Sequence, residues 1–162
     1  MMRPATTVIL ALATTLIAGC GFHLEGHTAL PGVMSHPYIE AQDQQSDFVQ
    51  SLRRDLLISG ARPSEGADRA SAVIDILGDE VTSRVLSVSA TNQPTEYQVT
   101  YSVRFSVSAG GKSLIGAQAL TATRSYTFDE SLLLAKEHEK AILTGAMGRD
   151  LAGIVMRRLA SL

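Results

Sequence analysis

Residues 97–108 alternate strictly between apolar and polar side chains, and this run limits the possible fold more than any other feature of the sequence. Its apolar positions are Tyr97, Val99, Tyr101, Val103, Phe105 and Val107. Because successive side chains of a strand point to opposite faces of a sheet, a period of two predicts an antiparallel strand with one buried face. The other face carries serine, threonine, glutamine and one arginine. Such a face is either plain solvent surface or a docking surface for another protein.

Shorter signals on both sides of this run complete an α+β pattern. Strands are predicted at 38–41, at 72–88 with a β-bulge at Gly78, and at 114–128 after a turn at 109–112. The first helix follows the N-cap residue Ser46 and runs to about Ser59, before the stop signal of Gly60. Its expected apolar stripe consists of Phe48, Val49, Leu52, Leu56 and Leu57.

A longer second helix is predicted from the acidic residues Asp129 and Glu130 to about Ala160. Its apolar face carries Leu143, Met147, Leu151, Val155 and Leu159, with Ile142 and Ile154 beside them. Gly145, Gly148 and Gly153 interrupt it, which indicates either close packing or simple sequence drift, since each costs about 1 kcal/mol relative to alanine. The order β-α-β-β-β-α predicts an α+β two-layer sandwich, in which two helices cover one face of a mainly antiparallel four-stranded sheet.

The amino-terminal segment has the features of a lipoprotein signal peptide. Arg3 precedes an uncharged stretch that ends at Cys20, the only cysteine of the chain. This stretch is too short for a membrane span of about 20 residues but suits a signal peptide. Small residues directly before Cys20 form a lipobox, in which the thiol receives a diacylglyceryl group and the freed amine is acylated. The alternative is an ordinary secretory signal with a coincidental cysteine.

The lipobox predicts three regions. Residues 1–19 are removed, residues 20–36 form a lipidated tether, and residues 37–162 form a single periplasmic α+β domain. Gly21, where an aspartate would favour retention at the inner membrane, favours the outer membrane. Two or three acyl chains give a stable anchor.

Composition and motifs argue against several other classes of protein. With 14 basic and 16 acidic residues the chain lacks the basic character of a nucleic-acid binder. A single cysteine excludes a disulfide framework and a multi-cysteine zinc site. His23 and His27 have metal-ligand spacing but no obvious third ligand, so neither a metal nor another cofactor is expected beyond the lipid on Cys20. No nucleophile elbow is present, and the chain is predicted not to be an enzyme.

Arg124 and Lys136 are candidate ligands for a phosphate of an anionic glycolipid. Arg124 lies in the last predicted strand, and Lys136 lies in the first turns of the helix that follows. Their closeness in sequence suggests that the two cations meet. The alternative is a role in solubility or in ion pairs with acidic neighbours, namely Asp129, Glu130, Glu137 or Glu139.

Four blocks in the right order resemble the lipopolysaccharide-assembly lipoprotein family, LptE, also called RlpB. They are the opening Cys20-Gly21-Phe22-His23-Leu24, the block 95–98, the block 124–129, and Leu134-Ala135-Lys136 with the acidic residues and the helix end that follow it. Together they span nearly all of residues 20–160.

The resemblance implies a role that composition does not reveal. Members of this family plug the LptD β-barrel of the outer membrane, assist its assembly, bind lipopolysaccharide and help to deliver it to the outer leaflet. Lys136 falls in a family block, so the resemblance implies a glycolipid contact there. The loop at 89–93 lacks the basic residue that relatives can carry. The competing hypothesis is a stand-alone outer-membrane lipoprotein that binds a small envelope ligand or modifies envelope components.

Overall fold

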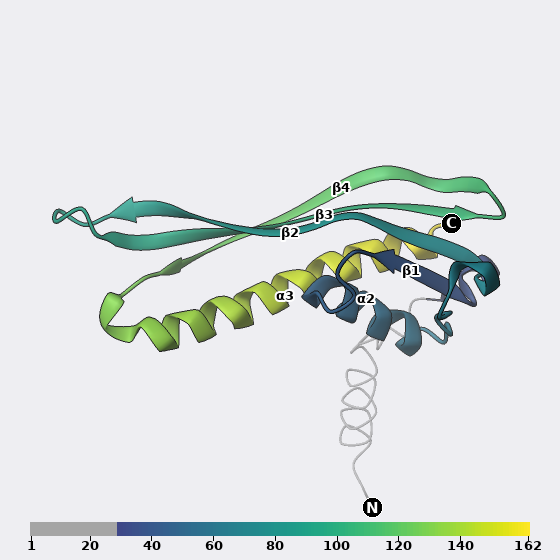
Figure 1. Ribbon diagram of the computed structural model, residues 1–162, viewed down its shortest axis with the longest axis horizontal. Helices are drawn as coiled ribbons and strands as arrows, with labels where there is room; N and C mark the ends of the chain where they lie inside the picture. Colours follow the sequence, from purple (N-terminus) through teal and green to yellow (C-terminus); the bar gives the residue numbers. More distant parts are fainter. Residues whose placement is uncertain (1–28) are drawn as a thin grey trace, which may run out of the picture.

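Four strands form one sheet in the order β1-β2-β3-β4 above two helices, α2 and α3 (Figure 1). The computed structural model describes residues 29–162. The strands are β1 (Pro37–Ala41), β2 (Ala72–Val88), β3 (Pro94–Ala109) and β4 (Lys112–Thr127), and the α-helices are α2 (Asp47–Ile58) and α3 (Leu133–Ala160). Short 3-10 helices lie at Gly32–Met34, Ala67–Arg69 and Glu130–Leu132. The predicted α+β sandwich is confirmed.

The sheet is mixed because α2 connects β1 to β2 and returns the chain in the same direction. β1 therefore pairs parallel with β2, whereas β2, β3 and β4 form an antiparallel meander. The register shifts between Ile76 and Gly78, where the bulge was expected. Gly110 and Gly111 have φ of 55° and 75°, and this pair of left-handed residues allows the tight turn between β3 and β4.

Helix α2 begins and ends where its sequence signals indicate. The Ser46 hydroxyl accepts a hydrogen bond from Val49 N at 3.2 Å, and Gly60 has φ of 85° just after the helix. The expected apolar stripe is buried except for Leu57, which is 55% exposed. The inclusion of Leu57 was wrong because one residue rotates a helix by about 100°, which turns Leu57 away from the face that contains Leu56.

Helix α3 buries the face that was predicted for its second half. Met147, Leu151, Val155 and Leu159 are at most 1% exposed, whereas Ile142 is 58% exposed and does not belong to this face. Of the three glycines, Gly148 alone has a clear packing reason within the described chain. A Cβ added there would lie 3.0 Å from Asp47 Cβ and 3.1 Å from Phe48 N.

The two layers have unequal lengths. β1 pairs with only the first residues of β2, up to Ile76, and α2 begins near Asp79, whose carboxylate accepts a hydrogen bond from the Ser46 hydroxyl. Beyond this level the sheet continues over the first half of α3 alone (Figure 1). Val81 and Val85 of β2 are consequently 40% and 45% exposed, although the β3 residues opposite them, Tyr101 and Tyr97, belong to the core face.

The described part of the predicted tether packs on the sandwich. Met34 is fully buried, and the Ser71 hydroxyl donates to Val33 O at 2.7 Å and accepts from His36 N at 2.9 Å. Packed structure therefore begins before residue 37.

Candidate functional site

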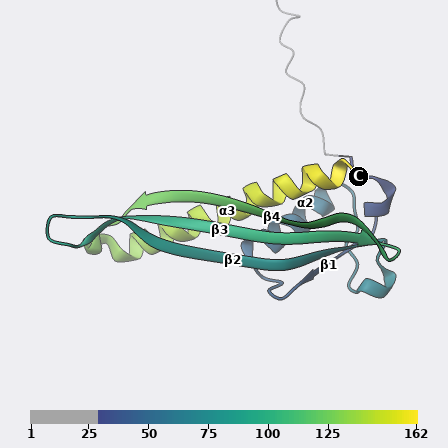
Figure 2. The same ribbon diagram turned by 90° about the horizontal axis from the view of Figure 1, so that it is seen from above.

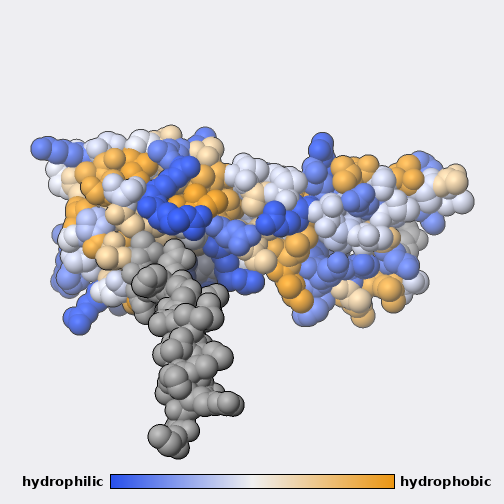
Figure 3. Space-filling view, turned by 180° about the vertical axis from the view of Figure 1, so that it is seen from behind, coloured by the Kyte–Doolittle hydropathy of each residue, from blue (hydrophilic) through white to orange (hydrophobic). Residues whose placement is uncertain are grey.

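The face of the sheet opposite the helices is polar, as the alternation in β3 predicted. Gln98, Thr100, Ser102 and Arg104 of β3 lie beside Arg84, Thr82, Glu80 and Gly78 of β2 on one side and Ser125, Thr123, Thr121 and Ala119 of β4 on the other. Side chains bridge the strands: Arg84 Nε donates to Gln98 Oε1 at 2.7 Å, and the hydroxyls of Ser102 and Thr121 lie 3.3 Å apart. Elsewhere the surface carries separate apolar patches with hydrophilic residues between them (Figure 3). The polar face can therefore form hydrogen bonds with another polar surface.

Arg124 lies at the outer strand of the sheet, on the side that faces the helices. Its Nη2 forms an ion pair with Asp150 Oδ2 of α3 at 3.2 Å, and its Nη1 donates to Thr123 O at 3.1 Å. A groove of about 560 Å³ runs here between β4 and the second half of α3. Arg149 and Arg157 also line it, so three arginines and one aspartate lie around the groove. Arginine prefers carboxylates and phosphates as partners, which makes the groove a candidate anion-binding surface.

Lys136 lies at the other end of α3, and the acidic residues that follow it are near an aromatic cluster. Its Nζ pairs with Glu139 Oε2 at 2.8 Å, and its side chain is only 17% exposed. Tyr97 stacks on Tyr126 with ring centroids 5.8 Å apart, and Phe128 meets Tyr97 edge-on at 5.1 Å. Partial burial, followed by the carboxylate of Glu137, raises the pKa of Tyr126 above its ordinary value. Lys136 is thus a partly buried lysine whose charge is paired with Glu139.

The structure does not bring Arg124 and Lys136 together. Arg124 contacts Asp150, and Lys136 lies about 21 Å before Asp150 along the axis of α3, at 1.5 Å per residue. Each cation is bonded to its own carboxylate. The two side chains therefore do not form a single phosphate site in this conformation. Arg149 and Arg157 were not singled out from the sequence, because nothing in the sequence shows that their side of α3 borders β4.

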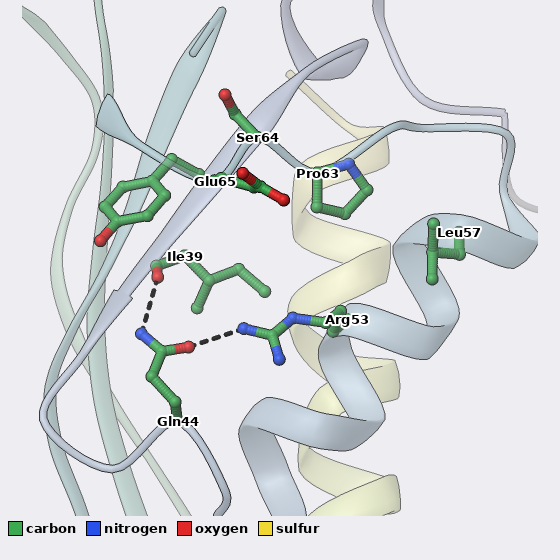
Figure 4. Close-up of a pocket in the computed structure, with 8 residues that line it drawn as sticks. Ile39, Gln44, Arg53, Leu57, Pro63, Ser64 and Glu65 are labelled. Atoms are coloured by element: carbon green, nitrogen blue, oxygen red, sulfur yellow. Dashed lines mark hydrogen bonds between the residues drawn. The ribbon is translucent and has the colours of Figure 1, made fainter. Parts of the chain in front are cut away.

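A second concave site lies at the end of the molecule that contains β1 and α2 (Figure 4). It has a volume of about 520 Å³ and is lined by Tyr38, Ile39, Gln44, Arg53, Leu57, Pro63, Ser64 and Glu65. Gln44 organises it: its Nε2 donates to Ile39 O at 3.1 Å, and its Oε1 accepts from Arg53 Nη2 at 2.6 Å. The pocket thus combines an oriented guanidinium with apolar walls.

Other predicted features lie partly outside the described residues. Cys20, His23 and His27 fall before residue 29. Within residues 29–162, no group of three His, Cys, Asp or Glu side chains is placed to hold a metal ion. No helix in that range is long and apolar enough to cross a membrane.

Comparison with known proteins identifies the family. The family model described as "LptE: Lipopolysaccharide-assembly" matches residues 36–159. The chain belongs to the LptE family. Among curated relatives, the LPS-assembly lipoprotein LptE of Photorhabdus laumondii is 28% identical over 160 residues, which cover 98% of this chain and 87% of the relative. That of Pectobacterium atrosepticum is 25% identical over 157 residues, which cover 96% and 85%.

Solved structures of similar proteins share the fold. Lipoprotein B from Nitrosomonas europaea superposes with a TM-score of 0.71 at 24% identity and covers 87% of this chain and 91% of its own. The rare lipoprotein B from Shewanella oneidensis gives 0.67 at 23% identity, with 78% and 94% covered. Membership in the LptE family, a family of lipopolysaccharide-assembly lipoproteins, confirms the predicted resemblance and the prediction that the chain is not an enzyme.

Proposed function

We propose that this LptE-family protein is anchored in the outer membrane by lipid on Cys20, plugs the LptD β-barrel, assists its assembly and helps to deliver lipopolysaccharide to the outer leaflet. The observation that carries the proposal is the family match over residues 36–159. The mature domain would lie on the periplasmic side and within the barrel lumen.

The polar sheet face supports a position inside a barrel. The lumen of an outer-membrane barrel is polar, unlike its lipid-facing exterior. A plug therefore needs hydroxyl, amide and charged groups that pair with lumen side chains and with trapped water. The strip from Gln98 to Ser106 and its neighbours on β2 and β4 offers such groups across three strands.

Glycolipid contact is proposed at Lys136 and Arg124 as two separate points. At each point a phosphate would compete with a carboxylate that now pairs with the cation, Glu139 for Lys136 and Asp150 for Arg124. Exposed ion pairs contribute only about 0–1 kcal/mol to stability. At Arg124, exchange of the carboxylate for a more highly charged phosphate therefore costs little free energy.

Purification of the tagged protein from detergent-solubilised outer membranes tests the proposal. We expect a β-barrel partner in stoichiometric amount, identified by mass spectrometry. Thr100→Trp places a large side chain in the middle of the polar face, and less barrel should be recovered with this variant. The matched variant Leu57→Trp introduces the same side chain at an exposed position of α2. Recovery of the protein without any barrel would contradict the plug and favour the stand-alone lipoprotein, with the Arg53 pocket as its first candidate binding site.

A direct binding assay with purified lipopolysaccharide tests the glycolipid contacts. Lys136→Glu and Arg124→Glu should each weaken binding and leave the circular dichroism spectrum unchanged. Lys140→Glu, on the same helix as Lys136, makes the same change of charge and serves as the control. Unchanged binding in either variant removes that residue from the proposed contact.

A further inference from the structure

The two edges of the sheet differ in whether their backbone is covered. The edge of β1 is short, and its outward carbonyls are occupied: Ser64 N donates to Pro37 O at 2.8 Å, and Gln44 Nε2 donates to Ile39 O at 3.1 Å and to Ala41 O at 3.3 Å. β4 lies at the opposite edge and spans Lys112–Thr127, with β3 as its one neighbouring strand. Within residues 29–162 no other segment forms a strand ladder with it. Apart from the hydrogen bond that Arg124 Nη1 donates to Thr123 O at 3.1 Å, no side chain in that range is bonded to the backbone of β4. An uncovered strand edge is a template for another extended segment.

Helix α3 extends beneath the place where a fifth strand would lie. Seen from above the sheet, the second half of α3 projects beyond β4 (Figure 2). Four consecutive residues of β4, Thr121 to Arg124, line the groove, so the groove follows the strand edge and not one face of the strand. A segment that pairs with β4 would therefore be covered on one side by α3, as the other strands are.

The floor of the groove contains a glycine that only the flexible end of an arginine side chain covers. Gly153 lies in the second half of α3, and a Cβ added there would meet only Arg157 Nη1, at 3.6 Å. Gly148, in contrast, is required by the close contact with α2. The packing of the described chain thus gives no reason for a glycine at 153.

The charges around the groove are unequal. Arg124 is paired with Asp150, whereas Arg149 and Arg157 form no ion pair among the side chains that the structure describes. Both guanidinium groups fold back over the preceding turn, near Gly145 and Gly153 respectively. Both groups are therefore displaced by about one turn toward the amino-terminal end of α3. Their positions along the helix axis remain about 12 Å apart, at 1.5 Å per residue.

We propose that the outer edge of β4 binds an extended acidic segment of a partner polypeptide as a fifth strand, with carboxylates at positions i and i+4 bonded to Arg149 and Arg157. Residues i and i+4 of a strand lie on the same face about 13 Å apart, which is close to the rise of about 12 Å along α3 between the two arginines. Backbone hydrogen bonds to β4 supply affinity, and the two ion pairs select the acidic sequence. The interaction goes beyond the proposed function and requires neither glycolipid nor a contact at the polar face.

A second copy of this chain fits the groove less well than an acidic partner. The sequence of β4 contains no aspartate or glutamate, so pairing of β4 with β4 would bring no carboxylate to Arg149 or Arg157. A glycolipid phosphate could meet one arginine but would leave the strand edge unpaired. The combination of an open backbone edge and two spaced cations favours a polypeptide.

Two peptides of identical composition test the proposal with the full-length protein. The first has glutamate at its second and sixth positions, valine at its fourth and threonine at the other four, with both termini blocked. The control has its glutamates at the second and fifth positions, on opposite faces of a strand. By fluorescence anisotropy the first peptide should bind at least fivefold more tightly than the control. It should also slow hydrogen exchange of backbone amides in β4.

Charge-reversal variants separate a specific site from general attraction. Arg149→Glu with Arg157→Glu should weaken binding of the first peptide at least tenfold, whereas Arg54→Glu with Arg84→Glu, which makes the same change of net charge elsewhere, should not. Four results would overturn the proposal: failure of the first peptide to bind at millimolar concentration, equal affinity for both peptides, equal loss in both double variants, or binding without protection of β4. Two further results would also overturn it. One is a dimer, detected by sedimentation equilibrium, whose formation protects β4 from hydrogen exchange without any peptide. The other is displacement of the peptide by the same concentration of inorganic phosphate in both double variants.

Discussion

Replacement of Gly148 by alanine measures how closely α2 and α3 pack. The new Cβ would lie 3.0 Å from Asp47 Cβ, 3.1 Å from the Asp47 carbonyl carbon and 3.1 Å from Phe48 N. Two of these atoms belong to the backbone of α2, so relief requires movement of the whole helix. Overpacking of this kind costs about 1–3 kcal/mol. Alanine also raises helix propensity by about 1 kcal/mol, which leaves a net destabilisation between near zero and about 2 kcal/mol.

Gly153→Ala is the matched control because it changes helix propensity equally without the backbone contact. Its Cβ would approach only the mobile end of Arg157, at 3.6 Å, so the variant should gain the full propensity term of about 1 kcal/mol. The difference in free energy of unfolding between the two variants therefore gives the cost of overpacking alone, about 1–3 kcal/mol. At about 4 °C per kcal/mol for a domain of this size, Gly148→Ala should melt roughly 4–12 °C below Gly153→Ala.

Thermal and urea unfolding, followed by circular dichroism, provide the measurement. Equal melting temperatures for the two variants would refute the reasoning, because they would mean that α2 and α3 are far enough apart to admit a methyl group. A melting temperature of Gly153→Ala below that of the unchanged protein would contradict the inference that the new Cβ makes only an ordinary contact there, with Arg157 Nη1 at 3.6 Å.

Three further changes test other parts of the structure. Tyr101→Phe removes the buried hydroxyl that accepts a hydrogen bond from Phe48 N at 3.1 Å. It should lower the free energy of unfolding, measured by urea titration, by about 1–3 kcal/mol. An unchanged free energy would mean that water replaces the hydroxyl. The Ser131 hydroxyl and N–H, which donate to Asp129 at 2.6 and 2.9 Å, lower the pKa of Asp129 below its ordinary value of 3.8. The charged form is thus the one that the fold favours, so Asp129→Asn should destabilise the protein at neutral pH, and its difference from the natural protein should vanish as the pH falls through the lowered pKa. A difference that is independent of pH would show that the carboxylate charge is unimportant. Cys20→Ser should leave the folded domain intact, with an unchanged melting temperature, but release it from the membrane fraction; loss of folding would contradict a purely anchoring role.

Elements with signals inside their own sequence were predicted well. The alternation in β3 identifies a strand and its buried face from twelve neighbouring residues, and the structure buries Val99, Tyr101, Val103, Phe105 and Val107 as expected. The limits of α2 follow from Ser46 and Gly60, because capping chemistry is local. The prediction that Leu57 is buried failed because hydrophobicity alone does not tell which of two adjacent leucines faces the core.

Sites that depend on how elements are offset could not be predicted. Arg124 and Lys136 are near one another in sequence, which suggested a shared site, but α3 extends back along the sheet and places Arg124 beside Asp150 instead. The groove with Arg149 and Arg157 exists only because α3 lies partly outside β4, an offset set by packing against α2 and the sheet. Gly148 and Gly153 look alike in the sequence, and only the neighbouring helix distinguishes them.

The parallel pairing of β1 with β2 has a consequence for the order in which the chain folds. Pro37 pairs with Ala72, thirty-five residues further along, whereas β3 and β4 meet through a turn of two glycines. Closing the longer loop costs about 3 kcal/mol of chain entropy before any contact forms, by the logarithmic dependence on loop length. We therefore expect the meander to assemble first and β1 to dock with α2 as a late step, a sequence that φ-values near zero in β1 would support. Contacts made late are absent from the folding transition state, so the stability that β1 and α2 contribute is expressed as slow unfolding and not as fast folding.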